Sequence, residues 1–221
     1  MPRRTLTAKI GTLASPALDA LVRTLAHVSP DVLTITGLVL TGFASALFAF
    51  AGGSGWVSPG MLRLGGIVAL VAAIFDMLDG RVARLRGRET KFGAYLDSTM
   101  DRYSDMLLYM GLLILYARLG RNGLMVLVWV AAFGGFMTSY ARARAESLIP
   151  HCPVGLMERP ERVVLIIVGA MLDRMVAVLW IVALLSNITA IQRIVYTYVE
   201  LRRGWKNVFT PPSAPHEDEK V

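Results

Sequence analysis

Long uninterrupted apolar runs restrict the fold of this chain more than any other feature of its sequence. A helix needs about 20 mostly apolar residues to span the ~30 Å hydrocarbon core of a membrane. Val32–Gly52 is such a run and contains no charged residue. Further apolar runs follow at Leu64–Phe75, Met106–Tyr116, Gly123–Tyr140, Val163–Leu172 and Met175–Ile191. The sequence therefore predicts an all-α integral membrane protein, with six transmembrane helices forming one domain at residues 31–204.

The two ends of the chain differ from this six-helix domain. Over residues 1–30, apolar residues recur at helical spacing, which favours an N-terminal amphipathic juxtamembrane helix over a disordered leader. These residues are Leu6, Ile10, Leu13, Ala17, Leu21 and Leu25. Residues 205–221 hold three prolines and an acidic cluster. Such a segment buries little apolar surface, so we expect a disordered cytoplasmic tail.

The net charge of +7 is distributed in a way that indicates membrane topology. With a cytoplasmic N-terminus, six spans would leave about 1–30, 80–92, 141–162 and 201–221 in the cytoplasm, and these segments hold most of the 23 Lys and Arg residues. Because positive charge concentrates on the cytoplasmic side, we expect both termini and the active site there. A nucleic-acid partner is not expected, since the sequence has no basic face with base-reading elements.

A cluster of aspartates lies where two of the predicted helices end. Its members are Asp76, Asp79, Asp97, Asp101 and Asp105. Residues three or four apart share one face of a helix, so each helix presents its carboxylates together. Ionisable residues inside membrane spans are costly, usually face a polar cavity and mark function. The pattern therefore predicts a shared polar site between the second and third spans.

So many carboxylates in apolar surroundings need compensating positive charge. Either arginines such as Arg84 and Arg102 supply it, or divalent cations do, and all-oxygen ligation suits Mg²⁺ or Mn²⁺. No His or Cys accompanies the cluster, so a zinc site is not expected. Metal-dependent phosphoryl chemistry is favoured, with a cation transporter as the alternative. Gly80 and Ala83 would leave room for a bulky ligand, although helix packing in membranes also favours small residues.

The aspartates also belong to a longer pattern with fixed spacing. Residues 76–101 read DMLDGRVARLRGRETKFGAYLDSTMD, which resembles the signature of the CDP-alcohol phosphatidyltransferases at every fixed position and every gap. The resemblance implies an enzyme that transfers a phosphatidyl group from CDP-diacylglycerol to an alcohol and releases CMP. The six spans and the amphipathic N-terminal helix are also typical of that family. Its members often form homodimers, and the small-residue faces of the third and fourth spans would permit one here.

The resemblance also implies roles for individual residues. Two Mg²⁺ or Mn²⁺ ions per active site would be held by Asp76, Asp79, Asp97 and Asp101. Asp101 is also the candidate catalytic base for the acceptor hydroxyl. The nucleotide-binding candidates are Asp31, Thr34, Gly80, Ala83, Arg84 and Gly93. Family members often carry Asn where Asp31 stands.

Arginines at the inner membrane edge indicate an acceptor that carries a phosphate. Guanidinium groups bind phosphate through two parallel hydrogen bonds, although each arginine alone could be an ordinary cytoplasmic anchor. The segments SYARARAE at 139–146 and GLMERPER at 155–162 resemble the inositol-phosphate branch of the family in actinobacteria and archaea, which more often has Lys where Arg142 stands. By that resemblance the acceptor phosphate would contact Ser139, Arg142, Arg159, Arg162 and Arg202.

The branch resemblance implies a particular acceptor and location. The acceptor would be inositol 1-phosphate, a phosphorylated polyol. Glycerol 3-phosphate is the alternative, because phosphatidylglycerophosphate synthases form a related branch. The protein would be a multi-pass protein of a prokaryotic plasma membrane. The donor lipid could carry either diacyl chains or archaeal ether-linked chains, because no sequence feature distinguishes the two.

Overall fold

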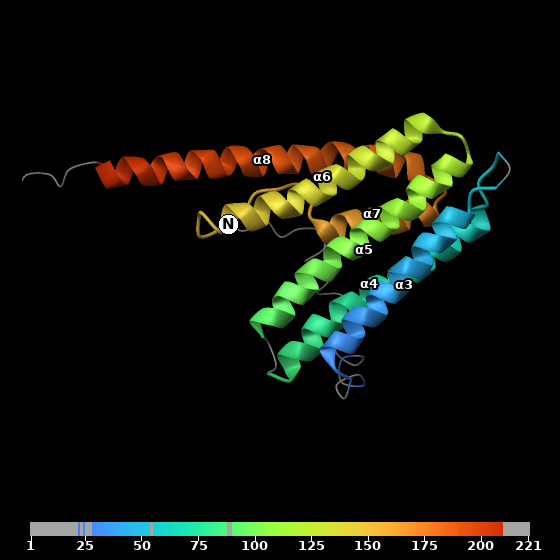
Figure 1. The fold of residues 1–221 in the computed structure, drawn as a ribbon, viewed down its shortest axis with the longest axis horizontal. Coiled ribbons are helices and arrows are strands. Elements are labelled where there is room, and N and C mark those ends of the chain that lie inside the picture. The colour runs from blue at the N-terminus through green and yellow to red at the C-terminus, as the bar shows by residue number, and fades with distance from the viewer. Residues whose placement is uncertain (1–21, 23, 25–27, 54, 88–89, 210–221) are drawn as a thin grey trace, which may run out of the picture.

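Every apolar run identified in the sequence forms a helix in the computed structural model. The model describes residues 22, 24, 28–53, 55–87 and 90–209. Its helices are α3 (Pro30–Phe50), α4 (Pro59–Leu85), α5 (Lys91–Arg118), α6 (Asn122–Glu146), α7 (Arg159–Met171) and α8 (Met175–Phe209) (Figure 1). The predicted all-α architecture and its six apolar helices are therefore confirmed.

Length and apolar composition identify this bundle as an integral membrane fold. Four helices are long and apolar enough to cross a bilayer, namely α3, α4, α6 and the Met175–Arg203 part of α8. The thirteen-residue α7 extends about 20 Å at 1.5 Å per residue, which is less than the ~30 Å hydrocarbon core. α5 is long enough, but five charged residues lie between its start and its middle, namely Lys91, Asp97, Asp101, Arg102 and Asp105.

Several helix ends follow directly from local sequence chemistry. Thr90 caps α5 by accepting a hydrogen bond from the Gly93 amide at 2.9 Å. Glu158 and Glu161 form a reciprocal capping box at the start of α7, which satisfies amide groups that have no partner within the helix. Gly87 follows α4 with φ +60°, a left-handed conformation that glycine adopts without steric cost. These caps fix the helix ends that carry the aspartates and arginines.

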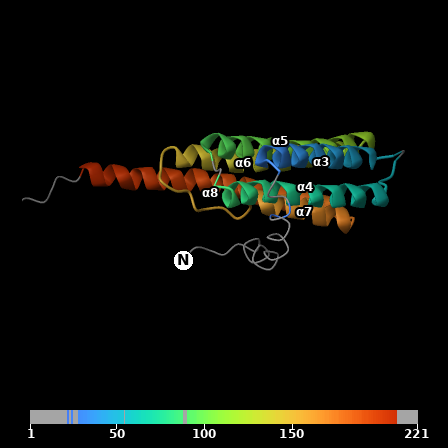
Figure 2. The same ribbon diagram turned by 90° about the horizontal axis from the view of Figure 1, so that it is seen from below.

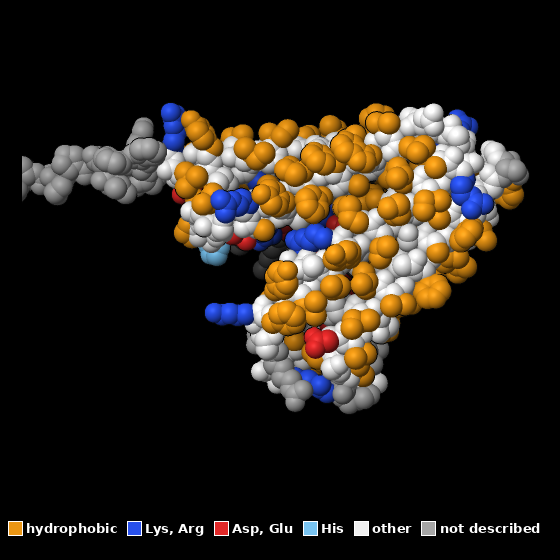
Figure 3. All heavy atoms as spheres, viewed as in Figure 1, with side chains coloured by type: hydrophobic (Ala, Val, Ile, Leu, Met, Phe, Trp, Pro, Cys, Tyr) orange, Lys and Arg blue, Asp and Glu red, His pale blue; other side chains and the backbone are white. Residues whose placement is uncertain are grey.

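The helices form two groups that diverge toward one end of the molecule. α3 packs against α4 and α5, α6 packs against α8, and the short α7 contacts α4 and α8. Seen from below, α3, α5 and α6 form one layer and α4, α7 and α8 the other (Figure 2). Figure 3 shows charged side chains gathered in the hollow between the two groups, while apolar side chains cover most of the remaining visible surface. The fold thus places a polar site between the two groups of helices.

The predicted chain ends fall largely outside the described residues. The surface helix expected at residues 1–30 lies almost entirely in the part that the structure does not describe, as do residues 210–221 of the expected tail. α8 continues to Phe209, beyond the expected start of the tail at Trp205. The first prolines after Arg203 are Pro211 and Pro212, and proline is the residue that breaks a helix most strongly. Gly204 is the only weaker helix breaker before them, so the helix can extend to Phe209.

Candidate active site

Three aspartates from two helices meet at the hollow end of the bundle. Asp76 on α4 and Asp97 and Asp101 on α5 each offer an oxygen atom, and these atoms lie within 4.8 Å of one another. All the donors are carboxylate oxygens, the set that Mg²⁺ and Mn²⁺ prefer. Asp101 Oδ1 is buried and has no hydrogen bond of good geometry, although Arg159 Nη1 lies 2.7 Å from it. Three carboxylates this close together fit a divalent cation by their donor set and their negative charge.

Asp79, expected as a fourth ligand, lines the same cavity as these three aspartates but is not among the oxygens within 4.8 Å of one another. It is almost completely buried, and its Oδ2 atom accepts a hydrogen bond from the Thr34 hydroxyl of α3 at 2.5 Å. Its Oδ1 atom accepts from the Gly80 amide at 2.5 Å. Both Asp79 oxygens therefore have partners within the protein in this structure, and its role as a metal ligand stays a prediction.

A cavity of about 420 Å³ opens on the α4 side of the aspartates. It is lined by Asp76, Met77, Asp79, Gly80, Arg81, Arg84, Asp97, Asp101 and Arg159. A Cβ atom at Gly80 would meet no other atom within 4 Å, so the α4 backbone is open to a ligand there. Two of the six nucleotide candidates, Gly80 and Arg84, therefore line a cavity beside the carboxylates.

The other four nucleotide candidates do not line this cavity. Thr34 reaches it only through its hydrogen bond to Asp79. Ala83 is half-buried, Asp31 is exposed in the first turn of α3, and Gly93 lies one turn before Asp97 in the first turn of α5. None of these four is among the cavity-lining residues.

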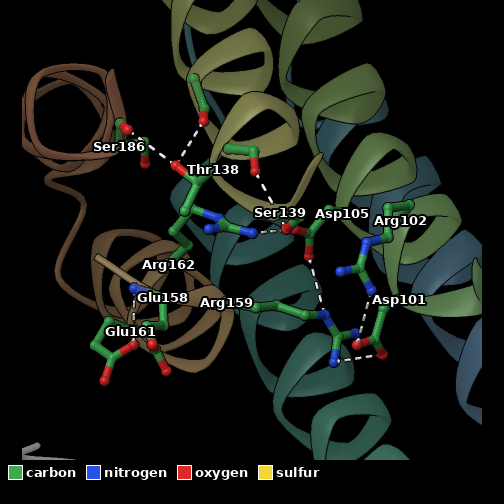
Figure 4. A network of polar contacts seen from close by, with 12 residues as sticks. Asp101, Arg102, Asp105, Thr138, Ser139, Glu158, Arg159, Glu161, Arg162 and Ser186 are labelled. Carbon is green, nitrogen blue, oxygen red and sulfur yellow. Dashed lines mark hydrogen bonds and ion pairs between the residues drawn. The ribbon is translucent and has the colours of Figure 1, made fainter. Parts of the chain in front are cut away.

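Arg159 is the central cation of the site. Its Nη1 atom lies 2.6 Å from Asp76 Oδ2 and 2.7 Å from Asp101 Oδ1. Its Nε atom lies 3.3 Å from Asp105 Oδ1. Figure 4 shows the Arg159 guanidinium between Asp101 and Asp105. An arginine expected to bind only the acceptor therefore also balances the charge of the carboxylate group.

Asp105 holds a second arginine in the bundle interior. Its Oδ2 atom accepts a hydrogen bond from Arg162 Nη2 at 2.7 Å, and the Arg162 side chain is only 1% exposed. Gly135 on α6 makes this possible, since a Cβ there would lie 3.1 Å from Arg162 Nε. Asp105 belongs to the predicted aspartate cluster and lies four residues after Asp101, on the same helical face. No role was predicted for it.

A second cavity of about 400 Å³ opens on the α6 side of the aspartates. Its lining includes Ser139, Arg142, Arg159 and Arg162, four of the five predicted acceptor-binding residues. The fifth, Arg202, does not line it: its guanidinium lies 5.2 Å from the centre of the Tyr198 ring, on an exposed part of α8. Arg202 is nine residues beyond Arg193, about 13 Å further along the helix.

Arg193 takes the position in the acceptor-side cavity that was expected for Arg202. It lines that cavity and is only 2% exposed. Its guanidinium donates to the carbonyl oxygens of Thr138 at 2.7 Å and Val154 at 2.9 Å. It also lies 3.4 Å from Glu158 Oε1. A charged residue within an apolar span was the signal that could have identified it.

The two cavities share Asp97, Asp101 and Arg159. One side offers an open helix backbone with Gly80 and Arg84, and the other offers guanidinium groups from α6, α7 and α8. A ligand on each side would therefore approach the same carboxylates. This geometry suits the transfer of a phosphoryl-linked group between two bound molecules.

Comparisons with known proteins identify the family of this chain. Residues 27–199 match the model of the CDP-alcohol phosphatidyltransferase family. The archaetidylinositol phosphate synthase of Methanothermobacter thermautotrophicus is 39% identical over 178 residues, which are 78% of this chain and 84% of that protein. The phosphatidylinositol phosphate synthase of Mycobacteroides abscessus is 35% identical over 190 residues, 82% of this chain and 81% of that protein.

Solved structures share the fold as well. The crystal structure of Mycobacterium tuberculosis phosphatidylinositol phosphate synthase with CDP-DAG bound superposes with a TM-score of 0.71 at 31% identity, covering 82% of this chain and 93% of that one. The same enzyme in complex with manganese and citrate gives a TM-score of 0.71 at 31% identity, covering 83% and 88%.

Proposed function

Because the chain belongs to the CDP-alcohol phosphatidyltransferase family, we propose that it transfers a phosphatidyl group from CDP-diacylglycerol to inositol 1-phosphate and releases CMP. The observation that carries the proposal is the meeting of two cavities at Asp97, Asp101 and Arg159. The donor would bind on the Gly80 and Arg84 side, and the acceptor on the arginine-lined side. Membership of an enzyme family also leaves the transporter interpretation of the aspartates without support.

Asp76, Asp97 and Asp101 are the residues proposed to hold two divalent cations, with Asp79 joining them if its side chain leaves Thr34. Bound Mg²⁺ or Mn²⁺ would neutralise charge on the donor pyrophosphate and so make CMP a better leaving group. The three clustered carboxylates, all oxygen donors, support this assignment. A structure of a 31% identical relative in complex with manganese supports it further.

Asp101 is the proposed general base. It lines both cavities, so it can reach an acceptor hydroxyl that approaches the lipid-side phosphorus of the donor. The hydroxyl oxygen would form the new phosphoester bond, its proton would pass to Asp101, and the bond to CMP would break. Arg159 contacts the Asp101 carboxylate and lines both cavities too, so it would orient the base and stabilise charge on the transferred group.

The acceptor-side cavity supports a phosphorylated acceptor. Arg142, Arg159, Arg162 and Arg193 all line it, together with the Ser139 hydroxyl. Arginine forks match phosphate oxygens in geometry and charge. Inositol 1-phosphate is preferred over glycerol 3-phosphate because the matched relatives are named as synthases of phosphatidylinositol phosphate or archaetidylinositol phosphate.

The proposed acceptor can be tested by CMP release from the purified protein. The protein would be supplied with CDP-diacylglycerol and Mn²⁺, with inositol 1-phosphate, glycerol 3-phosphate or serine offered separately. We expect CMP with inositol 1-phosphate and none above background with the others, and Asp97→Asn serves as the inactive control. Release with glycerol 3-phosphate alone would overturn the acceptor assignment, and no release with any alcohol would overturn the transferase assignment.

We also propose a cytoplasmic site in the plasma membrane of a prokaryote and a homodimeric assembly. The concentration of Lys and Arg in the segments flanking the aspartates supports the orientation. The exposed α6 face, where Trp129 stacks on Phe133 with ring centres 5.3 Å apart, offers an apolar surface for a second copy. Cross-linking across α6 in native membranes would test the dimer.

A further inference from the structure

A third cavity lies at the end of the bundle opposite the aspartates. The connections from α3 to α4, from α5 to α6 and from α7 to α8 gather at this end (Figure 1). They surround a cavity of about 750 Å³ whose lining includes Trp56, Tyr116, Arg121, Asp173 and Arg174. No residue of its lining belongs to either cavity at the aspartates. The proposed transferase reaction therefore leaves it without a role.

The charges around this cavity favour an anion. Arg121 and Arg174 both line it, and among the described residues neither has an ion pair. Asp173 is the one acidic residue of the lining, and Arg63 pairs with it. The cavity therefore presents two uncompensated guanidinium groups. Arginine is the residue best suited to bind phosphate through two parallel hydrogen bonds.

Backbone amides at this cavity also favour the binding of an anion. Arg121 directly precedes α6 and Arg174 directly precedes α8. The first three residues of α8, Met175, Val176 and Ala177, line the cavity. Amides in the first turn of a helix have no partner within the helix, and the positive end of the helix dipole lies there. Two long helices thus begin where the two arginines stand, an arrangement that binds anions.

The Tyr116 side chain offers a further polar group to a ligand in this cavity. It is 96% buried, being only 4% exposed, and it lines the cavity. Among the described residues its hydroxyl has no hydrogen-bond partner. The hydroxyl is not among the buried polar atoms that lack a partner, so it opens onto the cavity, and a tyrosine hydroxyl in a mostly buried side chain usually finds a hydrogen-bond partner. A ligand oxygen in this cavity would supply it.

Trp56, Leu62 and Leu124 make the rest of the lining partly apolar. A cavity with guanidinium groups and an apolar wall at a bundle end suits an amphiphile, and tryptophan is enriched at the level of lipid headgroups. We propose that this cavity binds the phosphate headgroup of an anionic phospholipid, at a site separate from the catalytic one. The phosphate would contact Arg121, Arg174 and the Tyr116 hydroxyl, while the acyl chains would follow the apolar wall.

Native mass spectrometry of the full chain in detergent can measure this binding. Phosphatidylglycerol is the anionic probe and phosphatidylcholine the zwitterionic one. We expect the Arg121→Gln/Arg174→Gln variant to bind phosphatidylglycerol at least about tenfold more weakly, because both charge-assisted contacts to the phosphate are lost. Tyr116→Phe should weaken it about three- to tenfold. Arg118→Gln is the matched control, because Arg118 lies at the same end, stacks on Phe50 and does not line the cavity.

Each outcome of this experiment bears on the proposal. Unchanged phosphatidylglycerol binding by the double variant, or equal loss in Arg118→Gln, would overturn it. Equal binding of phosphatidylcholine in the unmodified protein would also overturn it, because the site would then not select negative charge. If millimolar inorganic phosphate binds the protein and displaces the lipid completely, the ligand is the free anion and the lipid assignment is wrong. CMP release should stay at the unmodified level in all variants, which confirms that they fold.

Discussion

Arg159 donates a hydrogen bond from Nη1 to Asp76 Oδ2 over 2.6 Å, although the two residues stand 83 positions apart in the chain. The same guanidinium reaches Asp101 and Asp105 on a third helix. One arginine therefore lies where α4, α5 and α7 meet, among the carboxylates proposed to hold the metal ions. Its positive charge opposes the binding of a divalent cation at that place. Because Arg159 lines both cavities, it can contact a bound acceptor and the carboxylates at the same time.

Removing Arg159 should strengthen metal binding and weaken catalysis. In Arg159→Gln, the carboxylates lose a competing positive charge, and we expect Mn²⁺ to bind about tenfold more tightly when no substrate is present, a change of roughly 1.4 kcal/mol. CMP release should fall by about 100-fold because the acceptor phosphate loses a contact. Electron paramagnetic resonance of free Mn²⁺ measures the affinity.

Arg142→Gln is the matched control for this prediction. Arg142 also lines the acceptor-side cavity, but its partners are Glu146 and Glu158 rather than the aspartates. The Arg142→Gln variant should bind Mn²⁺ with the same affinity as the unmodified protein. If Arg159→Gln bound Mn²⁺ more weakly than the unmodified protein, Arg159 would be a support for the metal site and not its competitor.

Asp105→Asn should destabilise the bundle. The Asp105 carboxylate pairs with Arg162 in the interior and with Arg159 at its edge. Removing one partner of a buried ion pair costs about 3–5 kcal/mol, so the midpoint of thermal unfolding should fall on the order of 10 °C. Asp173→Asn provides the comparison, since the Asp173 pair with Arg63 is largely exposed and such pairs contribute about 0–1 kcal/mol. Equal midpoints for the two variants would contradict the role given to Asp105.

Substituting Arg193 and Arg202 separately tests which of these two α8 arginines binds the acceptor phosphate. Arg193→Gln should raise the KM for the phosphorylated acceptor by about 10- to 100-fold, because hydrogen bonds to charged groups contribute roughly 1.5–3 kcal/mol. Arg202→Gln should change it less than about twofold, since Arg202 is exposed and stacks on Tyr198. The reverse order of effects would restore the assignment made from sequence. The KM for CDP-diacylglycerol should be unaffected in both variants.

Gly80→Ala should separate stability from activity. A Cβ at this position would meet no other atom, and alanine in a helix interior is about 1 kcal/mol more favourable than glycine. The variant should therefore be as stable as the unmodified protein or more so, yet its KM for CDP-diacylglycerol should rise because the methyl group enters the donor-side cavity. Gly135→Ala should lose stability instead, because its Cβ would press against Arg162. A Gly80→Ala protein with unchanged KM would show that the donor binds elsewhere.

Local sequence chemistry determines where the helices of this protein form, where several of them end and which residues share a helical face. The apolar runs became helices because backbone groups in a membrane must bond within their own segment. The spacing of Asp97 and Asp101 put both on one face of α5, since residues four apart neighbour each other on a helix. Glycine past the end of α4 and threonine before α5 set the helix ends by cap chemistry that needs no distant partner. These features depend on residues only a few positions apart.

Only the tertiary structure decided which of these residues meet. Asp79 shares a helical face with Asp76, yet one of its carboxylate oxygens accepts a hydrogen bond from Thr34 on α3. Arg193 and Arg202 occur on the same helix, but its path past α6 brings Arg193 alone into the acceptor-side cavity. Asp105 received its partners from α7, more than fifty positions later in the chain. Such pairings depend on how helices cross, and no local pattern encodes a contact between segments that packing brings together.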